Sequence, residues 1–488
     1  MKQVKKAIVI GSGVGGLAVA IRLALKDYDV SLFEANSYFG GKLSSLEKDG
    51  FVFDAGPSLF TAPENIEALF TLANKDISTY FTYRDLDESC RYFFANGKTI
   101  TAKKNIEAFA IEVEKTFGEP AKNIKKYLSK SKKAYKNIGE LFLDFPLNLS
   151  LIGKYETYRA LFSVKLPYIT KSLNTYNESR FKTPEMVQLF NRYATYNGSN
   201  PYKAPAMLSM ISSLEQSQGT FYPYGGMISI TNALVKLAKE VGVQFYLNSK
   251  VEKIETSKNS VKGVLVNGKS HKADIVVSNM DIYYTYKNLL DDQKLSAKVL
   301  QQERSSSAFI FYWGINTTFP QLGLHNIFFS EDYKKEFKEI FNQAILPTEP
   351  TIYVNITSKY DKNHAPKQCE NWFVMVNAPA HSEHNWEEQK EKVKKFIIKQ
   401  LNKQLKINLE NHIIVEDTLS PLNIQEKTAS YMGSLYGTSS NSKMAAFFRQ
   451  QNTSKHYKNL FFCGGSVHPG GGIPLCFKSA KLVADAIK

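Results

Sequence analysis

The chain opens on an alternation of apolar and polar positions that predicts a strand, a helix and a second strand. Ala7–Ile10 is a short uninterrupted apolar run, as expected for a parallel strand buried on both faces. The next segment places Val14, Leu17, Ala18, Ile21 and Leu25 on one helical face. Val30–Phe33 predicts the second strand, and Glu34 stands at its end. The pattern therefore indicates one strand–helix–strand unit of an α/β sheet.

Glycines fill the turn between the first strand and the helix. Gly11, Gly13 and Gly16 have the spacing G-x-G-x-x-G. In this context Gly11 permits a tight turn, Gly13 lets the backbone approach a pyrophosphate, and Gly16 lets the helix pack close to the sheet. The free N–H groups of the helix N-terminus favour phosphates, and Glu34 can accept hydrogen bonds from a ribose. We therefore expect a dinucleotide site rather than a turn that binds nothing.

The last 30 residues repeat the strand–turn–helix pattern. Leu460–Cys463 predicts a strand, and Gly464, Gly465 and the glycines at 470–472 form permissive turns. Ile473 opens a helix with Pro474 in its first turn, where the missing N–H costs little. At a flavin, this second helix N-terminus would lie against the pyrimidine edge, where negative charge builds up on reduction. The alternative is a tight loop before an ordinary packed helix.

The middle of the chain predicts a further helix and further strands. An aromatic and glycine-rich block at 221–227 precedes a helical stripe at Ile230, Leu234 and Leu237. Strands are predicted at 243–247 and 251–255, and Asn267-Gly268 is a strong hairpin signal.

Composition narrows the choice of partners. The 488 residues are too many for one small domain, and the net charge of +16 favours an anionic partner such as phospholipid or nucleic acid. No nucleic-acid fold signature accompanies the charge, so we expect no nucleic-acid partner. The four cysteines form no C-x-x-C pair and fit a reducing cytoplasm. His381 and His384 have no evident third ligand, so no metal site is predicted.

Two further motifs resemble a known family. Gly40-Gly41-Lys42 and the segment 50–57, "GFVFDAGP", are similar to the extended dinucleotide motif of the flavin-dependent amine oxidase and phytoene desaturase superfamily. The segment 468–474, "HPGGGIP", resembles carotenoid desaturases of the phytoene type. In the family an Arg usually follows the Gly-Gly pair and contacts the cofactor phosphates. Lys42 keeps the charge but loses the bidentate fork.

The resemblance implies FAD as cofactor and a Rossmann-type FAD-binding domain joined to an α+β substrate domain with a helical membrane-contact region. The FAD-binding domain is expected to be discontinuous, at 1–75, 225–285 and 415–488, with 76–224 and 286–414 forming the substrate domain. The positions that the glycine motifs and the resemblance assign to the cofactor are Gly11, Gly13, Gly15, Gly16, Glu34, Ala35, Gly41, Lys42, Pro57, Ser58, Val251, Gly464, Gly465, Gly472, Ile473 and Pro474.

Desaturation would transfer a hydride from one carbon to the flavin and remove a proton from the neighbouring carbon. Glu215 is a candidate base, although a structural or surface glutamate is the alternative. Phe221 and Tyr224 are expected to line a polyene channel, and His468 to contact substrate or flavin unless it is structural. The electron acceptor is left open between oxygen, a quinone and a redox protein.

Basic and apolar segments between 121 and 169 suggest a membrane surface. Seven lysines fall between Ala121 and Asn137, and largely apolar patches follow at 141–151 and 160–169. No stretch reaches the about 18 apolar residues that span a bilayer, so contact would be peripheral, at the cytoplasmic face. A solvated lysine-rich helix is the alternative.

Within the resembling family the whole pattern is nearest to hydroxycarotenoid 3,4-desaturases. The expected substrate is therefore a hydroxylated carotenoid in carotenoid biosynthesis. The alternatives are a phytoene desaturase, a flavin amine oxidase, and a non-enzymatic prenyl-protein carrier of the same fold.

Overall fold

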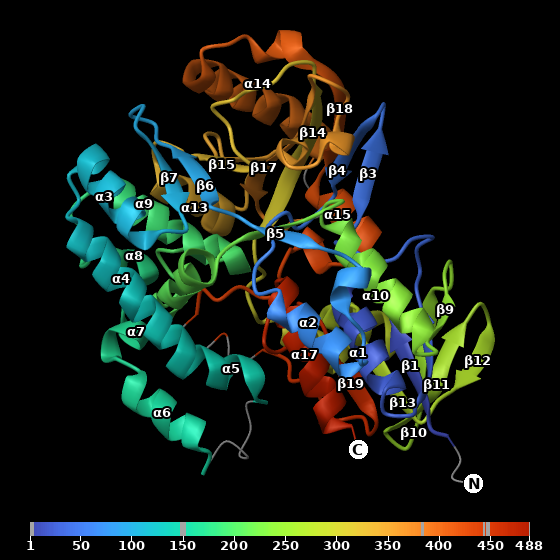
Figure 1. Cartoon of the computed structure of the whole chain (residues 1–488). Helices are drawn as coiled ribbons and strands as arrows, with labels where there is room; N and C mark the ends of the chain where they lie inside the picture. Colours follow the sequence, from blue (N-terminus) through green and yellow to red (C-terminus); the bar gives the residue numbers. More distant parts are fainter. Residues whose placement is uncertain (1–3, 147–152, 382–384, 443–444, 446–448, 488) are drawn as a thin grey trace.

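The computed structural model describes residues 4–146, 153–381, 385–442, 445 and 449–487. Its central element is a five-stranded parallel sheet in the order β19-β13-β1-β2-β9. The strands are β1 (Lys6–Ile10), β2 (Asp29–Phe33), β9 (Gln244–Tyr246), β13 (Ile275–Ser278) and β19 (Leu460–Phe462). Three distant stretches of sequence thus form one sheet, in the lower right of Figure 1.

Both faces of this sheet are buried, which explains its continuous apolar runs. Ala7 and Val9 face a core shared with α1 (Val14–Ala24), α10 (Ile228–Glu240) and α17 (Ile473–Ala486). Ile8 and Ile10 face the opposite way, against an antiparallel sheet of β10 (Val251–Ser257), β11 (Ser260–Val266) and β12 (Lys269–Lys272). The predicted hairpin turn is confirmed, because Asn267 and Gly268 join β11 to β12 with φ of 50° and 69°.

A seven-stranded mixed sheet forms the second part, in the order β18-β14-β17-β16-β15-β6-β7. All its neighbours are antiparallel except β15 and β6. The strands are β6 (Glu88–Phe93), β7 (Thr99–Lys103), β14 (Ser307–Ile315), β15 (His325–Phe328), β16 (Ile352–Asn355), β17 (Glu370–Ala378) and β18 (Ile413–Leu419). One face packs on α14 (Trp386–Leu405), at the top of Figure 1.

A group of short helices extends from this sheet, at the left of Figure 1. An aromatic core shared with β6 and β7 includes residues of α3, α4, α7, α8 and α9. The helices are α3 (Ile106–Phe117), α4 (Ala121–Ala134), α5 (Glu140–Asp144), α6 (Tyr155–Ser163), α7 (Leu166–Thr170), α8 (Leu173–Glu178) and α9 (Pro184–Asn191). The apolar patch expected at 141–151 lies partly outside the described residues. Within the described ranges, the structure holds no helix both long and apolar enough to cross a membrane.

The remaining short elements connect the two sheets. They are the hairpin of β3 (Ser45–Lys48) and β4 (Phe51–Asp54), the pair of β5 (Tyr83–Asp85) and β8 (Phe221–Pro223), and the helices α2 (Glu64–Leu72), α11 (Ile282–Tyr284), α12 (Gln293–Leu300), α13 (Tyr333–Lys338) and α15 (Pro421–Thr428). The domain boundary expected at residue 415 falls inside β18, which pairs with β14 and so belongs to the seven-stranded sheet.

Candidate active site

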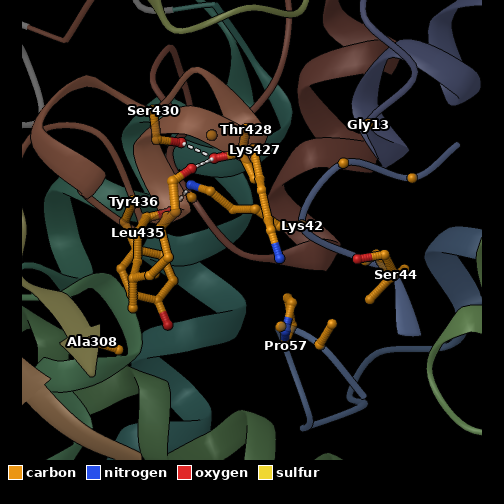
Figure 2. A pocket seen from close by; sticks show the side chains of 18 of the residues that line it. Gly13, Lys42, Ser44, Pro57, Ala308, Lys427, Thr428, Ser430, Leu435 and Tyr436 are labelled. Carbon is orange, nitrogen blue, oxygen red and sulfur yellow. Dashed lines mark hydrogen bonds between the residues drawn. The ribbon is translucent and has the colours of Figure 1, made fainter. Parts of the chain in front are cut away.

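One cavity of about 1280 Å³ runs between the two sheets. Its lining comes from the first glycine turn, the end of β2, the loops at 40–46 and 55–61, the start of β10 and the glycine turns at 464–473. The seven-stranded sheet closes the other side. Figure 2 shows Gly13, Ser44 and Pro57 on one side of this cavity and Leu435 and Tyr436 opposite them.

The first glycine turn forms a cradle that larger side chains would fill. Gly11 has φ of 92°, and a Cβ on Gly16 would lie 2.0 Å from the Gly11 carbonyl oxygen. A Cβ on Gly13 would lie 2.8 Å from Nδ2 of Asn279. Gly11 and Gly16 therefore cannot be replaced without strain, and the turn presents the N-terminus of α1 to the cavity, where unpaired N–H groups bind anions.

Glu34 is held rigidly at the end of β2. One carboxylate oxygen, Oε2, accepts hydrogen bonds from the N–H and the hydroxyl of Ser12, at 2.8 and 2.7 Å. The other, Oε1, accepts the N–H of Asn36 at 2.9 Å. Oε1 keeps acceptor capacity, which is what recognition of a ribose hydroxyl requires, and Glu34 lines the cavity.

The second glycine turn meets the first. The Cys463 thiol donates to the Gly15 carbonyl at 3.3 Å, and a Cβ on Gly15 would lie 3.2 Å from the Cα of Gly464. Gly472 and Ile473, where α17 begins, line the same cavity as Gly13. The two helix N-termini therefore face one space, as a single dinucleotide would require.

Asn279 is a residue of this site that the sequence analysis missed. It follows β13, lines the cavity, and stands against both glycine turns: a Cβ on Gly15 would lie 2.8 Å from its Oδ1, and one on Gly464 2.6 Å. The signal available in the sequence was its place directly after a strand of the parallel sheet, where ligands bind.

Alternate positions of the seven-stranded sheet form the other wall. The side chains that line the cavity are Ala308, Ile310 and Tyr312 of β14, His325 and Ile327 of β15, Tyr353 of β16, and Phe373, Met375 and Asn377 of β17. Positions between them, such as Phe311 and Val374, pack on α14 instead. The wall is mainly apolar and aromatic, and it opens directly onto the dinucleotide cradle.

Comparison with known proteins identifies the family. A model described as "Flavin containing amine oxidoreductase" matches residues 14–488. The chain belongs to this family. It is 49% identical to a 1-hydroxycarotenoid 3,4-desaturase of Flavobacterium sp. (strain P99-3) and 35% identical to a 4,4'-diaponeurosporene oxygenase of Staphylococcus aureus (strain MSSA476). The alignments cover 99% of this chain in both cases, and 99% and 98% of those proteins.

Two solved structures share the fold of this chain. Wild-type putrescine oxidase bound to putrescine matches with a TM-score of 0.66 at 14% identity, over 99% of each chain. An oxidoreductase from Methanosarcina mazei matches with a TM-score of 0.65 at 15% identity, over 98% of this chain and all of that one. The family confirms the expected FAD-binding fold and the flavin cofactor, FAD, and the glycine cradle fits such a dinucleotide. The membrane-contact region stays a prediction.

Most positions expected to hold FAD in this flavin containing oxidoreductase line the cavity. They are Gly11, Gly13, Gly15, Glu34, Ala35, Gly41, Lys42, Pro57, Ser58, Val251, Gly464, Gly465, Gly472 and Ile473. Gly16 and Pro474 lie behind the lining. Gly16 permits the close packing of α1 against the turn, and Pro474 stands in the first turn of α17. Their contribution is to the shape of the two tips rather than to direct contact.

Lys42 lines the same cavity as the two glycine turns. Its ammonium group donates to the carbonyl oxygens of Leu435 and Ser434, at 2.8 and 3.2 Å. Burial lowers the pKa of Lys42 to about 8, although the nearby Asp281 carboxylate opposes this shift. Figure 2 shows its side chain beside Leu435 in the cavity. Its ammonium group has a third N–H, and the phosphate contact that the resemblance implies for Lys42 stays a prediction.

Glu215 does not have the surroundings of a catalytic base. Its carboxylate is paired with Arg192 at 2.7 Å and accepts further hydrogen bonds from Tyr92, Tyr193, Tyr196 and Gln216. Although burial opposes ionisation, Arg192 and these hydroxyl groups hold the pKa of Glu215 below its usual range. The candidate role as base is therefore corrected: Glu215 is a saturated counter-ion in the cavity wall.

His468 is structural, and its expected contact with flavin or substrate is wrong. The ring is fully buried and lies outside the cavity lining. Its Nε2–H donates to the Phe145 carbonyl at 2.9 Å, and burial lowers its pKa to about 4. The histidine thus ties the last glycine turn to the end of α5.

Phe221 and Tyr224 also fail to line the cavity. Phe221 lies in β8, which pairs with β5, and its ring packs between Phe60 and Tyr83. Tyr224 is 46% exposed on the outer surface. The wall that both were expected to supply comes instead from the seven-stranded sheet, which no local pattern near residue 221 indicates.

No metal site is found among the residues that the structure describes, in the sense of three or more His, Cys, Asp or Glu side chains placed to share an ion. His384, one half of the sequence pair, lies outside the described residues. All four cysteines are free thiols.

Proposed function

We propose that this protein is an FAD-dependent carotenoid desaturase that acts on a 1-hydroxycarotenoid and introduces the 3,4 double bond. The observation that carries the proposal is the single cavity in which a dinucleotide cradle opens onto an apolar, aromatic sheet face. A long polyene needs such a wall, because only apolar contact can bind it. The 49% identity along 99% of the chain to a protein of that activity supports the choice of substrate.

The protein's own task in this reaction is to position and to exclude water. When bound, the flavin supplies the acceptor for the hydride removed from one of the two adjacent carbons. Ile310, Phe373 and Met375 offer the polyene a dry apolar surface. The loop that carries Pro57 and Ser58 meets the same sheet, because the Tyr312 hydroxyl donates to the Ala55 carbonyl at 3.0 Å. A substrate held on this surface would have its reacting bond fixed beside the cofactor, which is how positioning lowers a barrier.

We propose further that the protein binds the cytoplasmic face of a membrane peripherally. The helices α6 and α7 expose six large apolar side chains: Tyr155 (73%), Tyr158 (51%), Leu161 (66%), Phe162 (90%), Leu166 (73%) and Ile169 (44%). Basic residues stand among them. Burial lowers the pKa of Lys130 on α4, and the positive charge of the nearby Lys165 adds to this shift. An apolar cluster ringed by cations suits an anionic lipid surface, from which a carotenoid would enter.

Expression in carotenoid-producing cells tests the function. Cells that accumulate a 1-hydroxycarotenoid should yield a pigment whose absorption moves to longer wavelength, since one conjugated double bond is added. Colour formed from colourless phytoene would instead assign the protein as a phytoene desaturase. Oxidation of an amine by the purified protein would assign an amine oxidase, and purification without FAD would indicate a carrier. Turnover with oxygen or with a quinone in its absence identifies the electron acceptor.

A further inference from the structure

The inner end of the cavity is polar, although a carotene backbone has nothing to hydrogen-bond. His325 on β15 is the centre of this region and is 4% exposed. Its Nδ1 lies 2.7 Å from the Tyr353 hydroxyl and 3.2 Å from Nδ2 of Asn355. Its Nε2 has no hydrogen-bond partner in the described part of the chain.

The neighbours of Nδ1 fix the tautomer of His325. Nδ2 of Asn355 can only donate, and it also donates to the Leu324 carbonyl at 3.1 Å. If the amide were flipped, its Oδ1 would face the Leu324 carbonyl oxygen, and two acceptors would oppose each other. Nδ1 must therefore be the acceptor, and the proton resides on Nε2. Burial lowers the pKa of His325 to about 4, which keeps the ring neutral. The cavity wall thus carries a buried N–H donor in need of an acceptor.

Glu215 cannot serve as that acceptor. It lies close enough to influence the pKa of His325, but its two oxygens are already occupied by Arg192, three tyrosine hydroxyls and Gln216. Arg192 also lines the cavity, and its Nε is buried without a partner among the described residues. Among the described residues, Nε of Arg192 and Nε2 of His325 are thus unsatisfied donors of side chains that line the cavity, and the nearby Glu215 has no free oxygen. Such a site selects an uncharged oxygen acceptor over a cation or an amine.

We propose that His325 binds the hydroxyl oxygen of the substrate's end group, with Nε2–H as donor, and thereby selects hydroxylated over plain carotenes. The inference rests on the proposed function and names the residue that reads the hydroxyl.

The position of His325 agrees with the bond that would react. The Tyr353 hydroxyl, which contacts His325, also lies 2.7 Å from Oγ of Ser58 in the loop assigned to the cofactor. The hydroxyl-binding group is thus linked by one side chain to the cofactor loop. In a 1-hydroxycarotenoid the hydroxyl is separated from the 3,4 bond by only C1 and C2. A hydroxyl held at Nε2 would therefore keep that bond within a few bond lengths of the His325 ring.

The test compares two carotenoids that are identical except for the 1-hydroxyl. Their binding to the FAD-loaded protein is measured by the quenching of its tryptophan fluorescence. The wild-type protein should bind the hydroxylated carotenoid about tenfold more tightly, the effect of one satisfied buried donor. In His325→Phe this preference should disappear through weaker binding of the hydroxylated partner alone. His325→Gln, which keeps an N–H donor, should retain part of the preference and guards against misfolding of the Phe variant.

Ile327→Val is the control, because Ile327 lines the cavity from the same face of β15. It should leave the ratio of the two affinities unchanged. The inference would be overturned if the wild-type protein bound both carotenoids equally, or if His325→Phe lost affinity equally for both. Desaturation of the carotenoid would still support the proposed function in that case. Binding of neither carotenoid, with no pigment change in cells, would overturn both.

Discussion

The Cys463 thiol donates a hydrogen bond to the Gly15 carbonyl at 3.3 Å and joins the last strand of the parallel sheet to the first helix. The contact brings together the two glycine turns that were identified separately at opposite ends of the sequence. It also leaves no room between them: a Cβ on Gly15 would meet Cys463 Sγ at 3.1 Å and Gly464 Cα at 3.2 Å. The cradle for FAD therefore depends on close contact between two backbones.

Gly15→Ala should weaken FAD binding about tenfold or more, because the added methyl forces the two turns and Asn279 apart. The flavin content of the purified variant measures the effect. Gly118→Ala is the control, since Gly118 caps α3 with φ of 76° and has open space around it. It should cost about 1 kcal/mol of stability and leave the flavin content unchanged. Full flavin in Gly15→Ala would contradict the assigned cradle.

The parts of the site that the sequence could predict are those encoded by short-range stereochemistry. The turn around Gly13, the acid Glu34 and the helix start at Ile473 each need a particular residue type at a fixed spacing, so the pattern itself reveals them. The cofactor half of the site, and the sheet that carries it, followed from such patterns.

The substrate half depends on strand pairing between distant segments. Tyr353 and His325 meet because β15 and β16 pair in one register, which no local pattern specifies. Phe221 was misplaced for the same reason, since its nearness in sequence to α10 says nothing of the pairing of β8 with β5. His468 stands inside a correctly interpreted motif, yet its ring turns toward Phe145.

Lys42 should make FAD binding depend on pH. Burial lowers the pKa of Lys42 to about 8 in the protein without cofactor. A phosphate beside the ammonium group would raise that pKa, so binding takes up a proton above pH 8 and affinity should fall there, by up to about tenfold per pH unit. Titration of the apoprotein with FAD from pH 7 to about 10 measures this.

Two variants of Lys42 separate charge from packing. Lys42→Met should bind FAD weakly at every pH, with a flat profile above pH 8, because no group remains to take up the proton. Lys42→Arg stays charged throughout and should also be flat, but at higher affinity. A flat profile for the wild-type protein would show that Lys42 does not contact the phosphates.

Asp54 should reduce stability at neutral and alkaline pH. Burial raises its pKa to about 7; only the N–H of Met227, which donates to its Oδ1 at 2.8 Å, opposes the shift. The folded state thus favours the protonated acid. The contribution of Asp54 to stability is fully present below pH 3.8, the pKa of an unperturbed aspartate, and it is lost as the pH rises through about 7. Asp54→Asn, which keeps the acceptor for Met227, should stabilise the protein by about 1–3 kcal/mol at pH 8 and hardly at all near pH 4.

Thermal unfolding at the two pH values measures this difference. Asp49→Asn is the matched control, because Asp49 is an exposed aspartate in the turn between β3 and β4. It should change the unfolding temperature equally little at both. A gain in Asp54→Asn that is the same at pH 4 and pH 8 would mean that ionisation is not its cause.

The exposed cluster on α6 and α7 should govern membrane binding. Phe162 and Leu166 are 90% and 73% exposed, and each would transfer most of its apolar surface into lipid on contact. The double variant Phe162→Asp, Leu166→Asp should therefore sediment about tenfold or more weakly with vesicles that contain phosphatidylglycerol. Vesicles of phosphatidylcholine alone should bind the wild-type protein less, and added salt should reduce the difference, because the lysines act through charge.

Ile111→Asp separates this surface from general apolar exposure. Ile111 is 61% exposed on α3, which Figure 1 places at the other end of the helical group from α6. Its replacement should leave vesicle binding unchanged. The double variant should still bind FAD, because the cradle draws no residue from α6 or α7. If Ile111→Asp weakened binding as much as the double variant, the contact with lipid would not be specific to α6 and α7, and a carotenoid would have to enter the cavity from another side.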